Sequence, residues 1–258
     1  MRNLDKIIYY SDELNDEFAG DNISPIKIDV KYKYIRNGFI KKFTHFFWYR
    51  MVATPIAYLY LKLKFRHKIV NKKILKKLKG GYFMFGNHNH NMADAFIPSM
   101  ISVPKDTYII VHANNVSIPY LGKITPSLGA IPLPADLEAT RNFIECMKYH
   151  VSKRRAICIY PEAHIWPYYT KIRPFKDLSF RYPVEFNKPV ITFTNVYLKR
   201  KYSKNPKIVT YLDGPFYPDL NLSKKEAREA LRNKAYDAMV ERSKLNNVEI
   251  IKYVKRGA

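Results

Sequence analysis

Short apolar runs alternate with amphipathic helical segments through most of the chain, and this alternation restricts the fold more than any other feature of the sequence. The apolar runs with a strand pattern occupy residues 82–86, 107–112, 155–160, 189–196 and 208–212. Helical patterns cover residues 91–101, 136–153 and 223–245. Asp136 is a predicted N-cap, and Ser223 with Glu226 forms a capping box. Because strands that alternate with helices are typical of α/β domains, we predict an α/β fold with a mixed, largely parallel sheet flanked by helices.

Positive charge is concentrated toward the N-terminus. The chain has 45 Lys and Arg against 22 Asp and Glu, a formal net charge of +23. Residues 30–93 include fifteen Lys and Arg and no acidic residue. So basic a surface indicates a polyanionic partner, either an anionic bilayer or nucleic acid. The many aromatic residues in this stretch favour the membrane interface. Because DNA- and RNA-binding motifs are absent, we expect no nucleic-acid partner and keep a basic nucleic-acid-binding module as the alternative.

The best candidate for a membrane span, residues 43–61, is close to the length that crosses a bilayer. His45, Arg50 and Pro55 interrupt it, and an arginine at the centre of a spanning helix costs about 2.5–3.5 kcal/mol on insertion scales. We therefore predict an N-terminal amphipathic helix or helical hairpin that lies in the headgroup layer of an anionic membrane surface. An ordinary surface helix and a true span are the alternatives. The predicted location is the cytoplasmic face of the cell membrane, peripheral or monotopic, and the two cysteines fit a reducing compartment.

The composition changes near residue 80. Residues 1–29 hold the early acidic residues and look like a loose arm, and a basic segment at 71–80 ends at Gly80 and Gly81. We predict that residues 1–80 form a basic, aromatic-rich arm with membrane-association helices, and that residues 81–258 form the second domain.

The densest polar cluster, residues 86–94, follows the first predicted strand and contains His88, His90 and Asp94. A carboxylate beside an imidazole selects its tautomer and stabilises its protonated form, so the pair is the smallest general-base unit. His90 and Asp94 share one helical face, whereas His88 meets Asp94 only if His88 lies in the loop. A structural histidine beside a capping aspartate and a zinc site remain alternatives.

A second cluster, residues 157–166, begins with a predicted buried strand that ends at Tyr160 and Pro161. The strand places Glu162 at the edge of the sheet. Because an unpaired buried carboxylate is costly, Glu162 is expected to bind a ligand, a helix N-terminus or a cation. A loop glutamate paired with a lysine is the alternative.

Together the two clusters resemble the glycerolipid and lysophospholipid acyltransferases of the bacterial 1-acyl-glycerol-3-phosphate acyltransferase type. That family has a histidine and an aspartate separated by four or five residues, and His88-Asn-His-Asn-Met-Ala-Asp94 is similar to the version with five intervening residues. Residues 160–163 resemble its Phe-Pro-Glu-Gly block, residues 175–176 its Phe-Lys segment and residues 189–192 its Pro-Val strand. The order and spacing of the blocks agree over roughly residues 80–196, and residues 81–258 are then the acyltransferase domain.

The resemblance implies transfer of a fatty acyl group from a thioester, on coenzyme A or acyl carrier protein, to the hydroxyl of a lyso-lipid. The acceptor it implies first is 1-acyl-glycerol-3-phosphate, in phospholipid synthesis. It implies His88 as the general base and Asp94 as the residue that orients it, with His90 as the rival base. No acyl-enzyme is required, so we expect Cys158 to be buried core. We expect no cofactor and no metal; a metal-dependent hydrolase that uses His88, His90 and Asp94 is an alternative.

Two blocks depart from the family pattern. Pro134 stands where the family usually has arginine, and residues 163–166 replace Gly-Thr-Arg-Ser. Because an arginine fork grips phosphate bidentately, these departures concern the acceptor, and a different lipid acceptor is the alternative. The expected substrate-binding residues are Asn87, Glu162, His164, Arg173 and Lys176, with Arg141 as a further substitute for the missing arginines and Trp166 better suited to packing.

Overall fold

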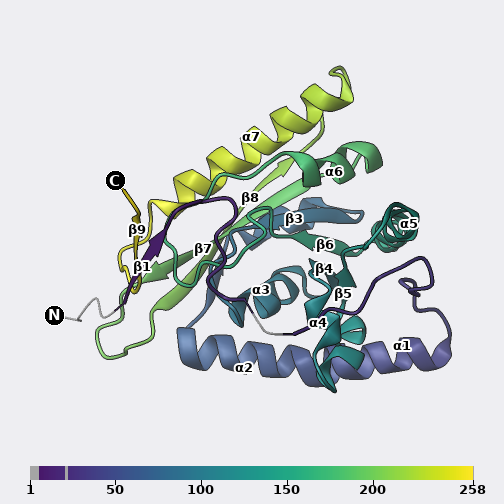
Figure 1. Cartoon of the computed structure of the whole chain (residues 1–258), viewed down its shortest axis with the longest axis horizontal. Coiled ribbons are helices and arrows are strands. Elements are labelled where there is room, and N and C mark those ends of the chain that lie inside the picture. The colour runs from purple at the N-terminus through teal and green to yellow at the C-terminus, as the bar shows by residue number, and fades with distance from the viewer. Residues whose placement is uncertain (1–5, 21–22, 258) are drawn as a thin grey trace.

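Seven strands form the central sheet of the computed structural model, which describes residues 6–20 and 23–257 (Figure 1). The strands are β2 (Lys68–Val70), β3 (Tyr82–Gly86), β4 (Thr107–Val111), β5 (Ala130–Pro132), β6 (Ala156–Ile159), β7 (Val190–Leu198) and β8 (Lys207–Phe216). Their order is β2-β8-β7-β3-β6-β4-β5, and each neighbouring pair is parallel except β7 with β8. The predicted mixed, largely parallel sheet is therefore confirmed.

Helices cover both faces of this sheet (Figure 1). One face carries α5 (Leu137–Ser152), α6 (Arg181–Phe186) and α7 (Lys224–Ser243), and the other carries α2 (Thr54–Phe65) and α3 (Ala93–Ser102). Successive side chains of a strand point to opposite faces, so Phe83 and Phe85 pack with α5 and α7, and Met84 packs with α2 and α3. The N-cap of Asp136 and the capping box of Ser223 are both confirmed. The remaining short elements are α4 (Asn114–Ser117) and short 3-10 helices at Lys72–Lys77, Leu121–Lys123, Thr125–Leu128 and Leu178–Phe180.

The apolar N-terminal segment forms a helix and not a hairpin. Helix α1 (Phe39–His45), a π-helical stretch (Phe46–Ala53) and α2 follow one another without a break and form one rod along the underside of the domain (Figure 1). Pro55, in the first turn of α2, has no backbone N–H to donate to the preceding turn, and the wider π turns accommodate it. Among the described residues, no helix combines the length and the apolar character that a membrane span requires.

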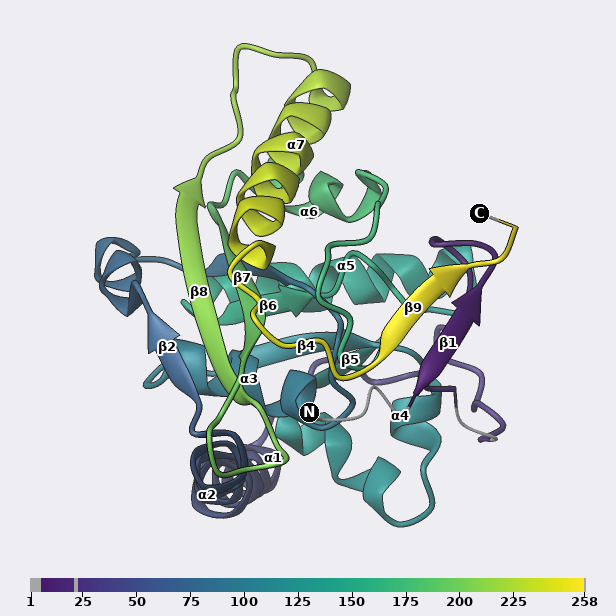
Figure 2. The same cartoon turned by 90° about the vertical axis from the view of Figure 1, so that its left-hand side faces the viewer.

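The expectation of a loose N-terminal arm is wrong for residues 6–20. Strand β1 (Ile7–Tyr10) pairs in parallel with β9 (Lys252–Lys255) in a second, two-stranded sheet (Figure 2). Trp166 donates its indole N–H to the carbonyl of Asp16 at 2.8 Å, and the ring of Phe18 packs edge-on against the indole at 5.1 Å. The predicted domain boundary at residue 80 stays a prediction; strand β2, from the N-terminal side of it, pairs with β8 in the main sheet.

His150 makes the stability of this fold depend on pH. The side chain is 5 % exposed, stacks on Tyr108 and accepts a hydrogen bond from Arg155 at 3.0 Å. Burial, and next the positive charge of Arg155, lower its pKa to about 3. Between this value and the ordinary pKa of about 6.5, only the unfolded chain binds the proton, so stability falls as the pH falls.

We expect His150 to lower the free energy of unfolding by about 2 kcal/mol at pH 5 relative to pH 7.5. Urea unfolding of the wild type and of His150→Gln at both pH values measures this contribution. The variant should lose less stability on acidification than the wild type does. Equal losses would show that His150 already carries a proton in the folded state at pH 5.

Candidate active site

The two polar clusters meet at the carboxyl ends of neighbouring parallel strands. After β3 the chain crosses to β4, which lies on the far side of β6. After β6 it crosses in the opposite direction to β7, which lies on the far side of β3. Ligands of open α/β sheets bind at such a reversal. His88 lies two residues after β3 and Glu162 three residues after β6. Gly86 allows this turn to pack closely, since a Cβ at that position would lie 2.1 Å from the ring of Phe193.

His88 and Asp94 form a hydrogen-bonded pair. The Nδ1 atom of His88 lies 2.8 Å from Oδ2 of Asp94, and the two side chains are 16 % and 1 % exposed. In the neutral imidazole, donation of Nδ1–H to the carboxylate leaves Nε2 as the unprotonated nitrogen. The imidazole of His88 therefore has the tautomer that a general base needs. His88 is also the more exposed member of the pair.

Asp94 is held in place by several donors. Its Oδ2 atom also accepts the backbone N–H of His90 at 2.9 Å, and its Oδ1 atom accepts the side-chain amide of Asn195 at 3.3 Å. Thr210 in turn donates to Oδ1 of Asn195 at 2.7 Å. These bonds satisfy a buried carboxylate and fix its direction toward the imidazole of His88.

Asn87 locks the loop onto the neighbouring strand β7. Its Oδ1 atom accepts the backbone N–H of Asn195 at 2.8 Å, and its Nδ2 atom donates to the carbonyl of Asn195 at 3.1 Å. The side chain is 2 % exposed. Asn87 therefore shapes the loop that carries His88; its predicted role as a substrate-binding residue stays a prediction.

Tyr160 and Asn195 are site residues that the sequence analysis did not identify. The ring of Tyr160 stacks on His88 with a centroid distance of 4.2 Å, and its hydroxyl donates to the carbonyl of Asp94 at 2.5 Å. Burial raises the pKa of this hydroxyl. A usable signal for Asn195 was its place as the one amide side chain within the apolar run 189–196.

Glu162 and Arg173 form a buried ion pair beneath the loop. One guanidinium nitrogen of Arg173 lies 3.3 Å from Oε2 of Glu162, and the side chains are 0 % and 2 % exposed. Glu162 also accepts the backbone N–H groups of His88 at 3.2 Å and of Arg173 at 3.1 Å. Burial raises the pKa of Glu162, and the charge of Arg173 opposes this shift. Through its bond to the backbone of His88, Glu162 positions the loop that carries His88.

The guanidinium of Arg173 is occupied by protein groups. It donates to the backbone carbonyls of His164 and Glu13 and lies over the indole of Trp166, 4.9 Å from the ring centroid. Trp166 is fully buried, as its expected packing role requires. Arg173 therefore joins the N-terminal segment to the loop that follows β6.

The other predicted substrate-binding residues lie farther toward the surface. His164 is about one-third exposed and pairs with Glu17 at 2.7 Å. Lys176 is exposed, and Arg141, 85 % exposed, pairs with Glu145. The assignment of these side chains to the acceptor stays a prediction.

His90 is placed differently from His88. Its Nδ1 atom accepts the backbone N–H of Ala93 at 3.1 Å, in the first turn of α3. The ring packs against Phe65 and Tyr168, and burial lowers its pKa. His90 therefore caps the helix with the nitrogen that would otherwise accept a proton, which favours His88 as the base.

Two further expectations concern Cys158 and metals. Cys158 is fully buried in β6 and burial raises the pKa of its thiol, so the predicted core role is confirmed. Within residues 6–20 and 23–257, no three His, Cys, Asp or Glu side chains are grouped as a metal site.

Comparisons with known proteins identify the family of this chain. The model of the Acyltransferase family matches residues 66–196, about half of the 258 residues, and this range includes both clusters. The fold is similar to the crystal structure of the 1-acyl-sn-glycerophosphate acyltransferase from Thermotoga maritima, with a TM-score of 0.56, 19 % sequence identity and 81 % of each chain covered. No curated protein matched the sequence. The resemblance inferred from the motifs is thus confirmed for the family, and the chain belongs to the Acyltransferase family and is an acyltransferase.

Proposed function

We propose that this enzyme transfers a fatty acyl group from an acyl thioester, on coenzyme A or acyl carrier protein, to the hydroxyl of a lyso-lipid in phospholipid synthesis. The observation that carries the proposal is the His88–Asp94 pair at 2.8 Å, at the carboxyl ends of the parallel strands. The first acceptor to be considered is 1-acyl-glycerol-3-phosphate, which the motif resemblance favours and which is the substrate named for the structurally similar Thermotoga maritima enzyme.

The chemistry needs one base and no protein nucleophile. Nε2 of His88 takes the proton of the acceptor hydroxyl while Asp94 stabilises the imidazolium. The acceptor oxygen attacks the thioester carbonyl and forms a tetrahedral intermediate. As the intermediate collapses, the carbon–sulfur bond breaks and the thiol leaves with the proton from His88. The products are the acylated lipid and the free thiol, and His88 returns to its neutral form.

The contacts of Arg173 favour a second candidate acceptor, a lipid hydroxyl without a phosphate. In the related family an arginine after the glutamate block is associated with the acceptor phosphate, and here that sequence is absent. Arg173, a predicted substitute, has its guanidinium bound by Glu162 and two backbone carbonyls. A phosphate would have to replace these partners or be held by other side chains, such as Lys176.

Product analysis distinguishes the two acceptors. Purified protein is incubated with an isotopically labelled acyl thioester and, separately, lysophosphatidate, other lysophospholipids and monoacylglycerol, and the product masses are determined. We expect an acylated product with one acceptor class and none after His88→Ala. Labelled phosphatidate supports the first acceptor, and labelled diacylglycerol the second. Turnover of no lipid hydroxyl would overturn the proposed function.

We further propose that the α1–α2 rod attaches the enzyme to an anionic membrane surface at the cytoplasmic face of the cell membrane. Every fourth residue along one line of the rod is exposed, and these residues are Phe39, Phe43, Phe47, Met51, Pro55, Leu59 and Leu63. Residues four apart are neighbours on a helix surface, so these seven side chains form a continuous apolar row along the rod. Such a row is favourable at the boundary between headgroups and acyl chains.

A basic hollow adjoins the C-terminal end of this rod. It is lined by Lys62, Arg66, His67, Lys68, Lys199, Arg200, Lys201, Tyr202 and Lys207. The β7–β8 loop passes beside the end of α2 (Figure 2), and Arg200 donates to the carbonyl of Lys64 at 2.8 Å. Lys and Arg near an anionic leaflet contribute about 1 kcal/mol each, so the apolar row and the basic hollow support the same attachment.

Replacement of two members of the apolar row is expected to weaken vesicle binding at least about tenfold, because each large side chain contributes about 1.5–3 kcal/mol when fully buried. The variant is Phe43→Ser with Leu63→Ser, whose side chains are 61 % and 74 % exposed. The matched control is Leu178→Ser with Leu220→Ser, 60 % and 68 % exposed beside helices on the opposite face. Sedimentation with phosphatidylglycerol-containing vesicles measures binding. Equal losses in the two variants would contradict the assignment.

A further inference from the structure

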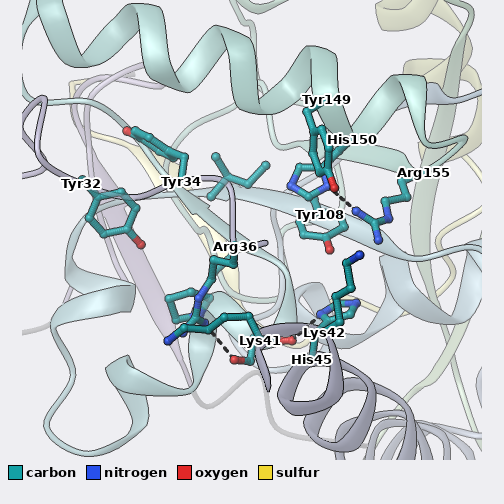
Figure 3. A pocket seen from close by; sticks show the side chains of 14 residues that line it. Tyr32, Tyr34, Arg36, Lys41, Lys42, His45, Tyr108, Tyr149, His150 and Arg155 are labelled. Atoms are coloured by element: carbon teal, nitrogen blue, oxygen red, sulfur yellow. Dashed lines mark hydrogen bonds between the residues drawn. The ribbon is translucent and has the colours of Figure 1, made fainter. Parts of the chain in front are cut away.

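A polar pocket, distinct from the basic hollow, lies beside α1 where β4 and β5 begin. His88 lies at the other ends of the strands, after β3. It has a volume of about 240 Å³ and is lined by residues from the segment before α1, from α1 itself and from the ends of α5, β4 and β5. Figure 3 shows its side chains, with those of Lys42 and Arg155 extending into the pocket from opposite walls. None of the acyltransfer chemistry described above uses this pocket.

The distance from the active site follows from the strand register. Arg155, on the pocket wall, immediately precedes Ala156, which pairs with Tyr82 at the first residue of β3. His88 lies six residues beyond Tyr82 along the same direction. At about 3.3 Å per residue in a parallel strand, the two sites are about 20 Å apart. One lipid headgroup therefore does not reach both.

The charge of the pocket is strongly positive. Its lining includes Arg36, Lys41, Lys42 and Arg155, and none of the described residues that line it is acidic. Arg36 donates to the neutral hydroxyl of Ser127 at 2.8 Å. Asp106, which lies 3.6 Å from Nε of Arg155, is shared with Arg50 at 2.5 Å, so it neutralises only part of this charge. Cations that line one pocket without matching carboxylates favour the binding of an anion.

The remaining lining fits a phosphate group on an organic molecule. Tyr32, Tyr108 and Tyr149 bring hydroxyl groups and aromatic surface to the same pocket. Guanidinium and ammonium donors match the several oxygens of a phosphate. The pocket adjoins α1, whose exposed residues Phe39 and Phe43 begin the apolar row. An acyl chain attached to the phosphate would therefore find apolar surface beside the pocket.

We propose that this pocket binds a phosphate group at a site separate from the catalytic His88. The chemistry is shared by an anionic phospholipid headgroup and free phosphate, and only the lipid source rests on the proposed attachment of the rod to a membrane. A phosphate bound here joins α1 to the ends of β4, β5 and α5. Occupancy would therefore fix the rod relative to the sheet.

The test measures binding to the full chain without an acyl donor. The two probes are inorganic phosphate and monomeric dihexanoyl phosphatidylglycerol, titrated by calorimetry. We expect Lys41→Ala with Lys42→Ala to weaken binding at least about tenfold, as loss of charged hydrogen-bond donors does. The matched control, Lys76→Ala with Lys77→Ala, removes the same charge from two adjacent exposed lysines outside both the pocket and the basic hollow and should change binding less than about twofold. Circular dichroism verifies that both variants are folded.

Each outcome decides the proposal. Binding of phosphatidylglycerol at least tenfold tighter than phosphate, lost only in the Lys41–Lys42 variant, supports the lipid source. Equal affinity for both probes, lost in the same variant, supports free phosphate. Binding of neither probe, or equal weakening in both double variants, overturns the pocket. None of these results depends on turnover, so a failure here is distinguishable from a failure of the proposed acyltransfer.

Discussion

Replacement of His88 by alanine is expected to lower the rate of acyl transfer at least about 10³-fold, equivalent to about 4 kcal/mol of transition-state stabilisation. The variant removes the proposed base, whose Nδ1 atom is bound to Asp94 at 2.8 Å and whose Nε2 atom is left to accept the hydroxyl proton. With a methyl group in place of the imidazole, no side chain takes the proton of the acceptor hydroxyl. The protonated hydroxyl is a poor nucleophile. Turnover is measured with a labelled acyl thioester and the best acceptor from the panel.

His90→Ala is the matched control for this experiment. His90 lies two residues away and its imidazole accepts a backbone N–H of α3, so its loss should reduce stability by about 1 kcal/mol as other lost helix caps do. We expect turnover within about tenfold of the wild type, because His88 and Asp94 are unchanged. The reverse pattern, with His90→Ala inactive and His88→Ala active in folded proteins, would transfer the role of base to His90.

The second large effect concerns stability. Arg173→Ala is expected to lower the free energy of unfolding by about 3–5 kcal/mol, because it leaves a buried charge without its partner. Glu162 is 5 % exposed and Arg173 is 1 % exposed. The variant also leaves the carbonyls of Glu13 and His164 without their guanidinium donor. Urea unfolding followed by far-ultraviolet circular dichroism measures the loss.

Removal of both charges distinguishes the effect of an unpaired buried charge from the effect of lost side-chain packing. In Glu162→Gln with Arg173→Met, a neutral amide and a side chain of similar length replace the ion pair, and replacement of a buried pair is less damaging than removal of one member. We expect the double variant to be at least about 2 kcal/mol more stable than Arg173→Ala alone. A loss below about 1 kcal/mol in Arg173→Ala would show that the ion pair does not stabilise the contact between the N-terminal segment and the loop that follows β6.

The elements that carry the site were predictable because their signals are local. The apolar run 82–86 is the strand β3, and Asp136 and Ser223 cap the helices that their neighbours predicted. The N-terminal helix was predicted from apolar and basic residues that are close in sequence. Its single continuous rod, and not a hairpin, depends on the π turns that precede Pro55.

The pairing of far-separated segments was not predictable in the same way. Nothing within residues 7–10 indicates a parallel partner at residues 252–255, so local patterns predict a loose arm there. The support of Asp94 by Asn195, 101 residues away, depends on the side-by-side position of β3 and β7. Such contacts follow from the order of strands in the sheet, which no local pattern records.

The sequence by itself determined the class of fold, the family and the candidates His88, Asp94 and Glu162, because periodicity, caps and motif spacing depend on neighbours along the chain. The tertiary structure decided which histidine faces the carboxylate, and it directed Arg173 inward to Glu162. Those choices depend on the packing of the loop between β3 and α3 against the strands beside it. Packing brings together groups that are distant in sequence, and it alone sets the distances at which a proton can move.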